Sequence, residues 1–106
     1  MFSELLEALQ ATDIPFTAYK WDRAPQVPYG VVQLEGGADT VPGDDGILLQ
    51  AVRGSVDLFA PTYSAEWPEA VQVAMADIVA WQLNSVQYED DTRLIHYEWL
   101  FEGVGY

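Results

Sequence analysis

The chain contains no cysteine, and only one of its 106 residues is a histidine. The absence of cysteine excludes disulfide bonds, thiolate zinc sites and cysteine nucleophiles. Basic residues are also scarce, because Lys20, Arg23, Arg53 and Arg93 face 17 aspartates and glutamates, which gives a formal net charge of −13. A molecule with this charge repels phosphate, so tight binding to nucleic acid or to an anionic membrane is not expected.

A long hydrophobic run is also missing, and no segment is apolar over the length needed to cross a bilayer. Glu4 and Glu7 lie where a secretory signal carries lysine or arginine. We therefore expect a soluble, unprocessed, intracellular protein. Half of the residues are hydrophobic and 13% are aromatic, which separates the chain from acidic disordered segments and predicts one folded domain over residues 1–106.

Two segments have the hydrophobic spacing of an amphipathic helix. Leu5 and Leu9 belong to a short N-terminal helix that ends before Pro15. A second helix is predicted from about residue 64 to about residue 83, because an apolar stripe with helical period begins at Val71 and acidic residues occupy the expected first turn.

Between and after these helices the period changes to two, which predicts strands over residues 16–22, 29–35 and 47–60, then a hairpin that turns at residues 89–92. Gly54 predicts a bulge or break in the third strand. The glycine-rich segment at about residues 36–46 is expected to be a long flexible loop. The predicted fold is α+β, with a mostly antiparallel sheet of about five strands and two helices packed on one face.

No catalytic, cofactor-binding or metal site is predicted. His96 has no second histidine, and no serine lies in a nucleophile elbow, so the interpretation favoured for His96 is a structural or surface role. The acidic residues of the long loop and of the hairpin turn lack the ligand spacing of a calcium loop, which favours solvated acidic turns. With 17 acids, pairs of carboxylates arise by chance and do not indicate acid–base catalysis.

Aromatic residues exceed what one small core needs, because each buried ring occupies about 150 to 250 Å² of contact. Tyr97 and Trp99 are expected to fill the layer between sheet and helices. For Trp67, Trp81 and Tyr106 we expect contacts between subunits, since tryptophan and tyrosine are enriched in interface cores.

The order of these elements resembles that of the tail terminator proteins, also called tail completion or head–tail joining proteins, of long-tailed bacteriophages. The resemblance covers nearly the whole chain and rests on layout. It comprises the short helix before residues 14–16, the aromatic strand at 17–21, the strand at 28–32, the long strand at 51–59, the helix opened by residues 66–69 and the closing hairpin from 86 to 101.

The resemblance implies a non-enzymatic ring of about six copies whose subunit interface closes by rotation. Such a ring caps the tail tube, stops its polymerisation and provides the surface to which the head attaches. The implied partners are further copies of the chain, the tail tube protein and the head–tail connector, with no cofactor and no membrane. The implied location is the tail or neck of a virion assembled in the host cytoplasm.

In such a ring, the segment at residues 36–46 would reach a neighbour or the lumen. Asp39, Asp44 and Asp45 are therefore further interface candidates. Candidates for the lumen lining, where DNA passes as a repelled polymer, are Asp44, Asp45, Glu89, Asp90 and Asp91. Two other functions are kept open: a neck stopper or adaptor of the head–tail connector, and an acidic monomeric binding or immunity module that blocks a basic partner.

Overall fold

The computed structural model describes residues 1–35, 39–43 and 46–104, and for residues 39–43 and 46–50 it describes the backbone alone. The fold is α+β, as predicted. Eight elements follow one another: α1 (Phe2–Gln10), β1 (Phe16–Ala18), β2 (Tyr29–Leu34), β3 (Asp39–Gly43), β4 (Gly46–Ala60), α2 (Glu66–Met75), β5 (Ala80–Glu89) and β6 (Leu94–Val104).

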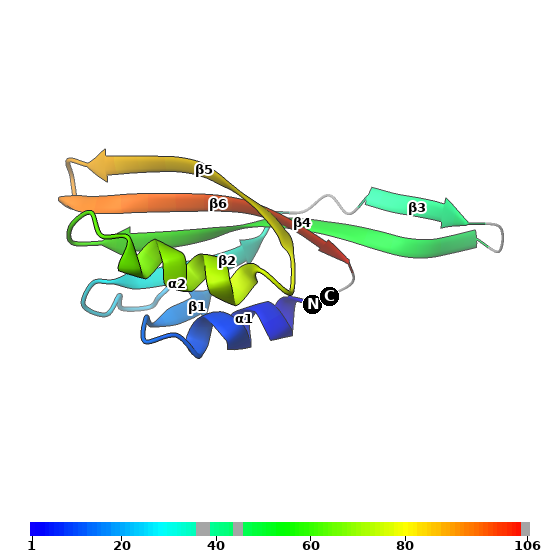
Figure 1. Cartoon of the computed structure of the whole chain (residues 1–106), viewed down its shortest axis with the longest axis horizontal. Helices are drawn as coiled ribbons and strands as arrows, with labels where there is room; N and C mark the ends of the chain where they lie inside the picture. Colours follow the sequence, from blue (N-terminus) through cyan, green and yellow to red (C-terminus); the bar gives the residue numbers. More distant parts are fainter. Residues whose placement is uncertain (36–38, 44–45, 105–106) are drawn as a thin grey trace.

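The strands form one sheet in the order β1-β2-β4-β6-β5, with β3 paired to β4 outside this path. The short pair of β1 with β2 is parallel, and the other pairs are antiparallel. Both helices lie on the same side of the sheet (Figure 1). We call this side the covered face and the opposite side the open face.

The core lies between the helices and the covered face. Leu5 and Leu9 of α1 and Val71 and Met75 of α2 are fully buried in one cluster with alternate residues of β2, β4 and β6. The predicted alternation in the last strand is confirmed, since one set of its residues is buried and the other is partly or fully exposed. The buried set consists of Ile95, Tyr97, Trp99, Phe101 and Gly103.

The segment predicted to be a loop at residues 36–46 contains strand β3, so that prediction is wrong over residues 39–43. The backbone of β3 pairs with β4 from Asp39 opposite Ala51 to Gly43 opposite Gly46. Pro42 is tolerated because β3 has β4 on one side only and because the register shifts between Val41 and Pro42. Gly36, Gly37, Ala38, Asp44 and Asp45 lie outside the described residues.

Strand β3 and the first third of β4 project from the body of the molecule (Figure 1). In the described chain, β6 pairs with β4 from Ala51 onward and β2 pairs from Gly54 onward, so residues 46–50 of β4 pair with β3 alone. We call residues 39–43 and 46–50 the arm. With the arm, the molecule measures 51 × 27 × 25 Å.

The second helix is shorter than predicted, because α2 ends at Met75 rather than near residue 83. Backbone N–H groups of Ile78 and Val79 both donate to the Met75 carbonyl, at 3.0 and 3.1 Å, and the chain then enters β5 at Ala80. The first strand is also shorter than predicted, since it stops at Ala18, where Tyr19 adopts a left-handed φ of 68°.

Gly54 forms neither a bulge nor a break, so that prediction is wrong. It pairs in continuous register with Leu34 on one side and Phe101 on the other. A Cβ at this position would meet the carbonyl oxygen of Gln33 and the ring of Phe101, so the absence of a side chain permits the close approach of three strands. The irregularity of the sheet lies instead in β5, where the register shifts between Leu83 and Ser85 and leaves Asn84 as the extra residue.

Candidate functional site

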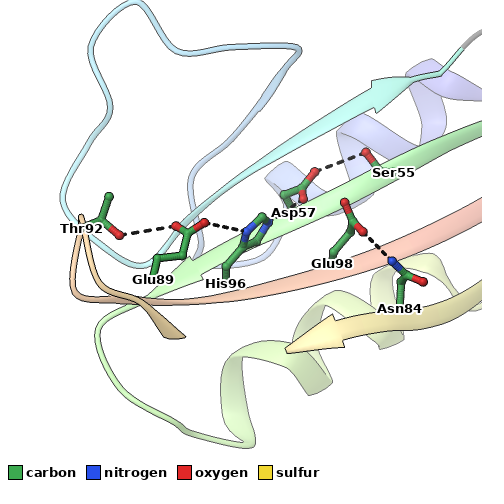
Figure 2. A network of polar contacts seen from close by, with 7 residues as sticks. All are labelled: Ser55, Asp57, Asn84, Glu89, Thr92, His96 and Glu98. Atoms are coloured by element: carbon green, nitrogen blue, oxygen red, sulfur yellow. Dashed lines mark hydrogen bonds and ion pairs between the residues drawn. The ribbon is translucent and has the colours of Figure 1, made fainter. Parts of the chain in front are cut away.

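The open face of the sheet carries a polar cluster centred on His96. Its Nε2 atom lies 2.7 Å from Oδ1 of Asp57 on β4, and its Nδ1 atom lies 3.2 Å from Oε2 of Glu89 at the end of β5. Figure 2 shows this chain of contacts continuing at both ends. The Ser55 hydroxyl donates to Asp57 at 3.3 Å, and the Thr92 hydroxyl donates to Glu89 at 3.4 Å. The cluster therefore links β4, β5, β6 and the hairpin turn.

A row of aromatic rings continues from His96 across the same face. The imidazole stacks on Phe59 with ring centroids 4.4 Å apart, and Phe59 stacks on Tyr29 at 5.2 Å. Trp21 meets Tyr29 edge to face at 6.5 Å, and its Nε1 donates to the Gly30 carbonyl at 3.1 Å. The register produces this row, because Tyr29 lies opposite Phe59 and Phe59 lies opposite His96.

Strand pairing also places two carboxylates against each other, since Asp57 of β4 lies directly opposite Glu98 of β6. Like charges in this position are destabilising. Each carboxylate is held by a separate partner, because Asp57 contacts His96 and Glu98 accepts a hydrogen bond of 2.7 Å from the Asn84 side chain (Figure 2). The bulged residue Asn84 thus has a polar role on the open face.

The pKa of His96 is raised above its ordinary value. The hydrogen bond to Asp57 is the main cause, and the charge of Asp57 and the contact with Glu89 act in the same direction. Burial of the ring opposes them by disfavouring the charged form. Protonated His96 is therefore the form that joins the two carboxylates, as a cation between two anions.

This arrangement differs from that of a catalytic triad. Both ring nitrogens contact carboxylates, and the Ser55 hydroxyl contacts Asp57 rather than the ring. Within the part of the chain that the structure describes, no group of His, Asp and Glu side chains is arranged to hold a metal ion. The cluster holds the ends of three strands together.

The partners of His96 were missed from the sequence. The interpretation as a structural or surface histidine considered only a second histidine and nucleophile motifs, whereas the two partners are Asp57 and Glu89. Asp57 lies 39 positions away in the chain. Only the register of β4 against β6 shows that Asp57 lies beside His96. Hydrophobic alternation predicts the face on which a residue lies, but not the residue that lies opposite it on the neighbouring strand.

His96 yields a prediction about pH. Its raised pKa means that its contacts stabilise the fold fully below the unfolded value of about 6.5, and that this contribution is lost as pH rises through the folded pKa. We expect His96→Gln to lower the free energy of unfolding by about 1.5 to 3 kcal/mol below that pH. The difference from the wild type should shrink at higher pH.

Urea titrations of both proteins at a series of pH values measure this difference. Repulsion among the acidic residues changes with pH in both proteins, so subtraction isolates the contribution of His96. A difference that stays constant from about pH 5.5 to about pH 8.5 would contradict the prediction.

A second surface feature lies on β5, the edge strand of the sheet. Trp81, Leu83, Val86 and Tyr88 lie opposite the buried residues of β6 and therefore point to the covered face, yet they are 37 to 52% exposed. We call these four residues the β5 stripe. Their exposure shows that the helices leave this edge of the covered face partly uncovered.

The outer edge of β5 has no strand beside it in the described structure, so its backbone groups are open to a further strand. Residues 80–88 include no charged residue, although the chain carries a net charge of −13. The bulge at Asn84 is the one feature of the strand that interrupts a regular edge. An exposed apolar edge of this kind is a typical surface for association with another chain.

The structure separates the candidate residues that the sequence singled out. Trp67 is the second residue of α2 and is partly buried against the core, whereas Trp81 belongs to the β5 stripe. Asp90 and Asp91 are exposed in the hairpin turn, while Glu89 contacts His96. Asp39 begins β3, and Asp44, Asp45 and Tyr106 lie outside the described residues.

A scan against models of known protein families gives no match to this chain, and a comparison with curated proteins gives none either. Within residues 1–35, 39–43 and 46–104, no helix is long and apolar enough to span a membrane. The fold and its surfaces define the class: a small, acidic α+β protein with a polar cluster on the open face of its sheet and an uncovered apolar edge strand.

Proposed function

We propose that this protein is a structural component of a virion, similar to the tail terminators of long-tailed bacteriophages, and acts without catalysis. The observation that carries the proposal is the uncovered edge strand with the β5 stripe. It presents four large apolar side chains and an open backbone edge on one side of a strongly acidic molecule. Such an edge promotes aggregation of a monomer, whereas in an assembly it is buried in the contact between subunits.

The arm supports a ring rather than a closed dimer. It projects from the end of the body and is unlike the β5 edge, so the molecule has two distinct surfaces suited to contacts (Figure 1). Contacts between unlike surfaces join subunits head to tail, and they form a ring when the rotation between subunits closes. The proposed ring, of about six copies, caps the tail tube, stops its growth and provides the attachment surface for the head.

Charge supports the same proposal. Subunits of net charge −13 repel one another, so association must use a surface with little charge, and residues 80–88 provide one. Exposed acids such as Asp90 and Asp91 in the hairpin turn would keep a lumen repellent to the DNA that passes through it. The proposed partners beyond further copies are the tail tube protein and the head–tail connector.

The proposal predicts that the β5 stripe controls assembly. We expect negative-stain images and native mass measurements of the purified protein to show rings, favoured by salt that screens repulsion between subunits. Leu83→Lys should abolish them, because it places a cation in the apolar contact. The matched control is Leu100→Lys on the open face, since Leu100 is 39% exposed and Leu83 is 42% exposed.

Loss of rings in Leu83→Lys alone supports the proposal. A wild-type protein that stays monomeric at every concentration and salt would overturn it and would favour the acidic binding module. Rings that attach to the connector side of a neck and leave tube length unchanged would favour a stopper or adaptor.

A further inference from the structure

A groove of about 840 Å³ lies between the end of α1 and the start of α2, away from both the polar cluster and the β5 stripe. Its apolar part is formed by the side chains of Ile14, Trp67, Ala70 and Val73, together with Pro28. Ile14 is 3% exposed and belongs to the core, whereas the apolar side chain of Val73 is 76% exposed. The groove therefore adjoins the core at one side and carries an exposed apolar side chain at the other.

Three carboxylates border this apolar surface. Asp13 follows α1, and Glu66 and Glu69 lie in the first turn of α2. The two glutamates also complement the dipole of α2. Asp13 belongs to a different segment, so the preference of a helix N-terminus for acidic residues does not explain why all three carboxylates lie here. Among the described ion pairs none includes these three residues, and no lysine or arginine lines the groove.

We propose that this groove binds a basic segment of a partner protein, in which lysine or arginine flanks a large apolar side chain. The apolar side chain would lie against Trp67 and Val73, and the flanking cations would pair with Asp13, Glu66 and Glu69. A groove with an apolar floor and charges of one sign at its rim selects a segment of the opposite charge. This inference is independent of ring formation.

Charge also argues against a second copy of the chain as the occupant. The whole chain has four lysines and arginines against 17 acids, so another copy brings further negative charge to an acidic rim. A basic partner gains binding free energy from both the apolar contact and the pairing of opposite charges.

A synthetic amphipathic peptide of leucine and lysine serves as the probe, labelled with fluorescein for anisotropy. Glu66→Gln combined with Glu69→Gln should weaken its binding about tenfold, since two partly solvated ion pairs are lost. The control is Asp90→Asn combined with Asp91→Asn, which changes net charge equally in the exposed hairpin turn. It should change binding by less than about twofold.

The apolar part of the site is tested without any change of charge. Val73→Ser should weaken binding by about threefold or more, whereas Val104→Ser, at a site that is 59% exposed on β6, should leave it unchanged. Amide and indole chemical shifts of the ¹⁵N-labelled protein locate the peptide, and they should change at Asp13, Trp67 and Val73.

Equal weakening by the two charge pairs would show attraction to the whole acidic surface and would overturn the proposal. Shift changes spread over the molecule or centred on the β5 stripe would also overturn it, as would the absence of binding at low salt. Ring formation in the stripe variants is measured separately, so failure here leaves the proposed function standing.

Discussion

Trp99→Ala is expected to lower the free energy of unfolding by about 3 to 5 kcal/mol, the range found when large buried aromatic residues are truncated. Trp99 is fully buried between β6 and the helices and stacks on Tyr97 with centroids 6.0 Å apart. Its Nε1 donates to the side-chain oxygen of Gln72 on α2 at 3.2 Å. The substitution therefore opens a cavity and removes a link between the sheet and the second helix.

A domain of this size has a free energy of unfolding of about 5 to 15 kcal/mol, so the substitution removes a large part of it. Urea denaturation followed by far-ultraviolet circular dichroism measures it without relying on tryptophan emission. Trp81→Ala on β5 is the matched control and should cost less than about 1.5 kcal/mol, because Trp81 is 37% exposed in the free chain. Equal costs for the two variants would show that the core is not centred on Trp99.

Gly54→Ala is expected to cost about 2 to 3 kcal/mol, although it adds a single methyl group. The new Cβ would meet the Gln33 carbonyl oxygen on β2 and the ring of Phe101 on β6. The carbonyl belongs to β2, which pairs with β4 on both sides of this position, so the strands must move apart for the methyl group to fit.

Gly103→Ala provides the control for Gly54→Ala, since both replace a strand glycine with the same residue. The nearest atoms to a Cβ at Gly103 are side-chain atoms of Met1 and Val79, at 3.0 to 3.2 Å. A flexible methionine side chain moves more easily than a paired backbone, so we expect a cost below about 1 kcal/mol. Denaturant titration of both variants compares them, and a smaller cost at Gly54 would contradict the proposed three-strand contact.

Alternation in the sequence was sufficient to predict the β6 strand and its faces. Ile95, Tyr97, Trp99 and Phe101 are apolar at every second position, and one face of the sheet is buried under the helices. When a strand has one buried face, a period of two reports that burial directly. The α+β class followed from the same kind of pattern in the other elements.

The end of α2 was not predictable in this way. Ile78 and Val79 continue the apolar spacing that begins at Val71, so helical and extended conformations both suit the local sequence. Pairing of nine residues of β5 with β6 decides between them, and that pairing depends on residues later in the chain. The strand β3 was missed for a similar reason, because Pro42 and its neighbouring glycines are typical of loops until β4 is placed beside them.

The bulge at Asn84 determines which residues of β5 lie on the covered face. Because Asn84 is an extra residue opposite Glu98, the stripe is spaced 81, 83, 86 and 88 rather than at every second position. Counting back from Tyr88 by twos would place Asn84 and Gln82 in the stripe and send Trp81 and Leu83 to the open face. Deletion of Asn84 would instead restore strict alternation, so all four residues of the β5 stripe would stay on the covered face, but the side chain that holds Glu98 would be lost. Among homologous chains, a one-residue gap here would therefore mark loss of the bulge and of the contact with Glu98, while the apolar edge stays on one face of the sheet.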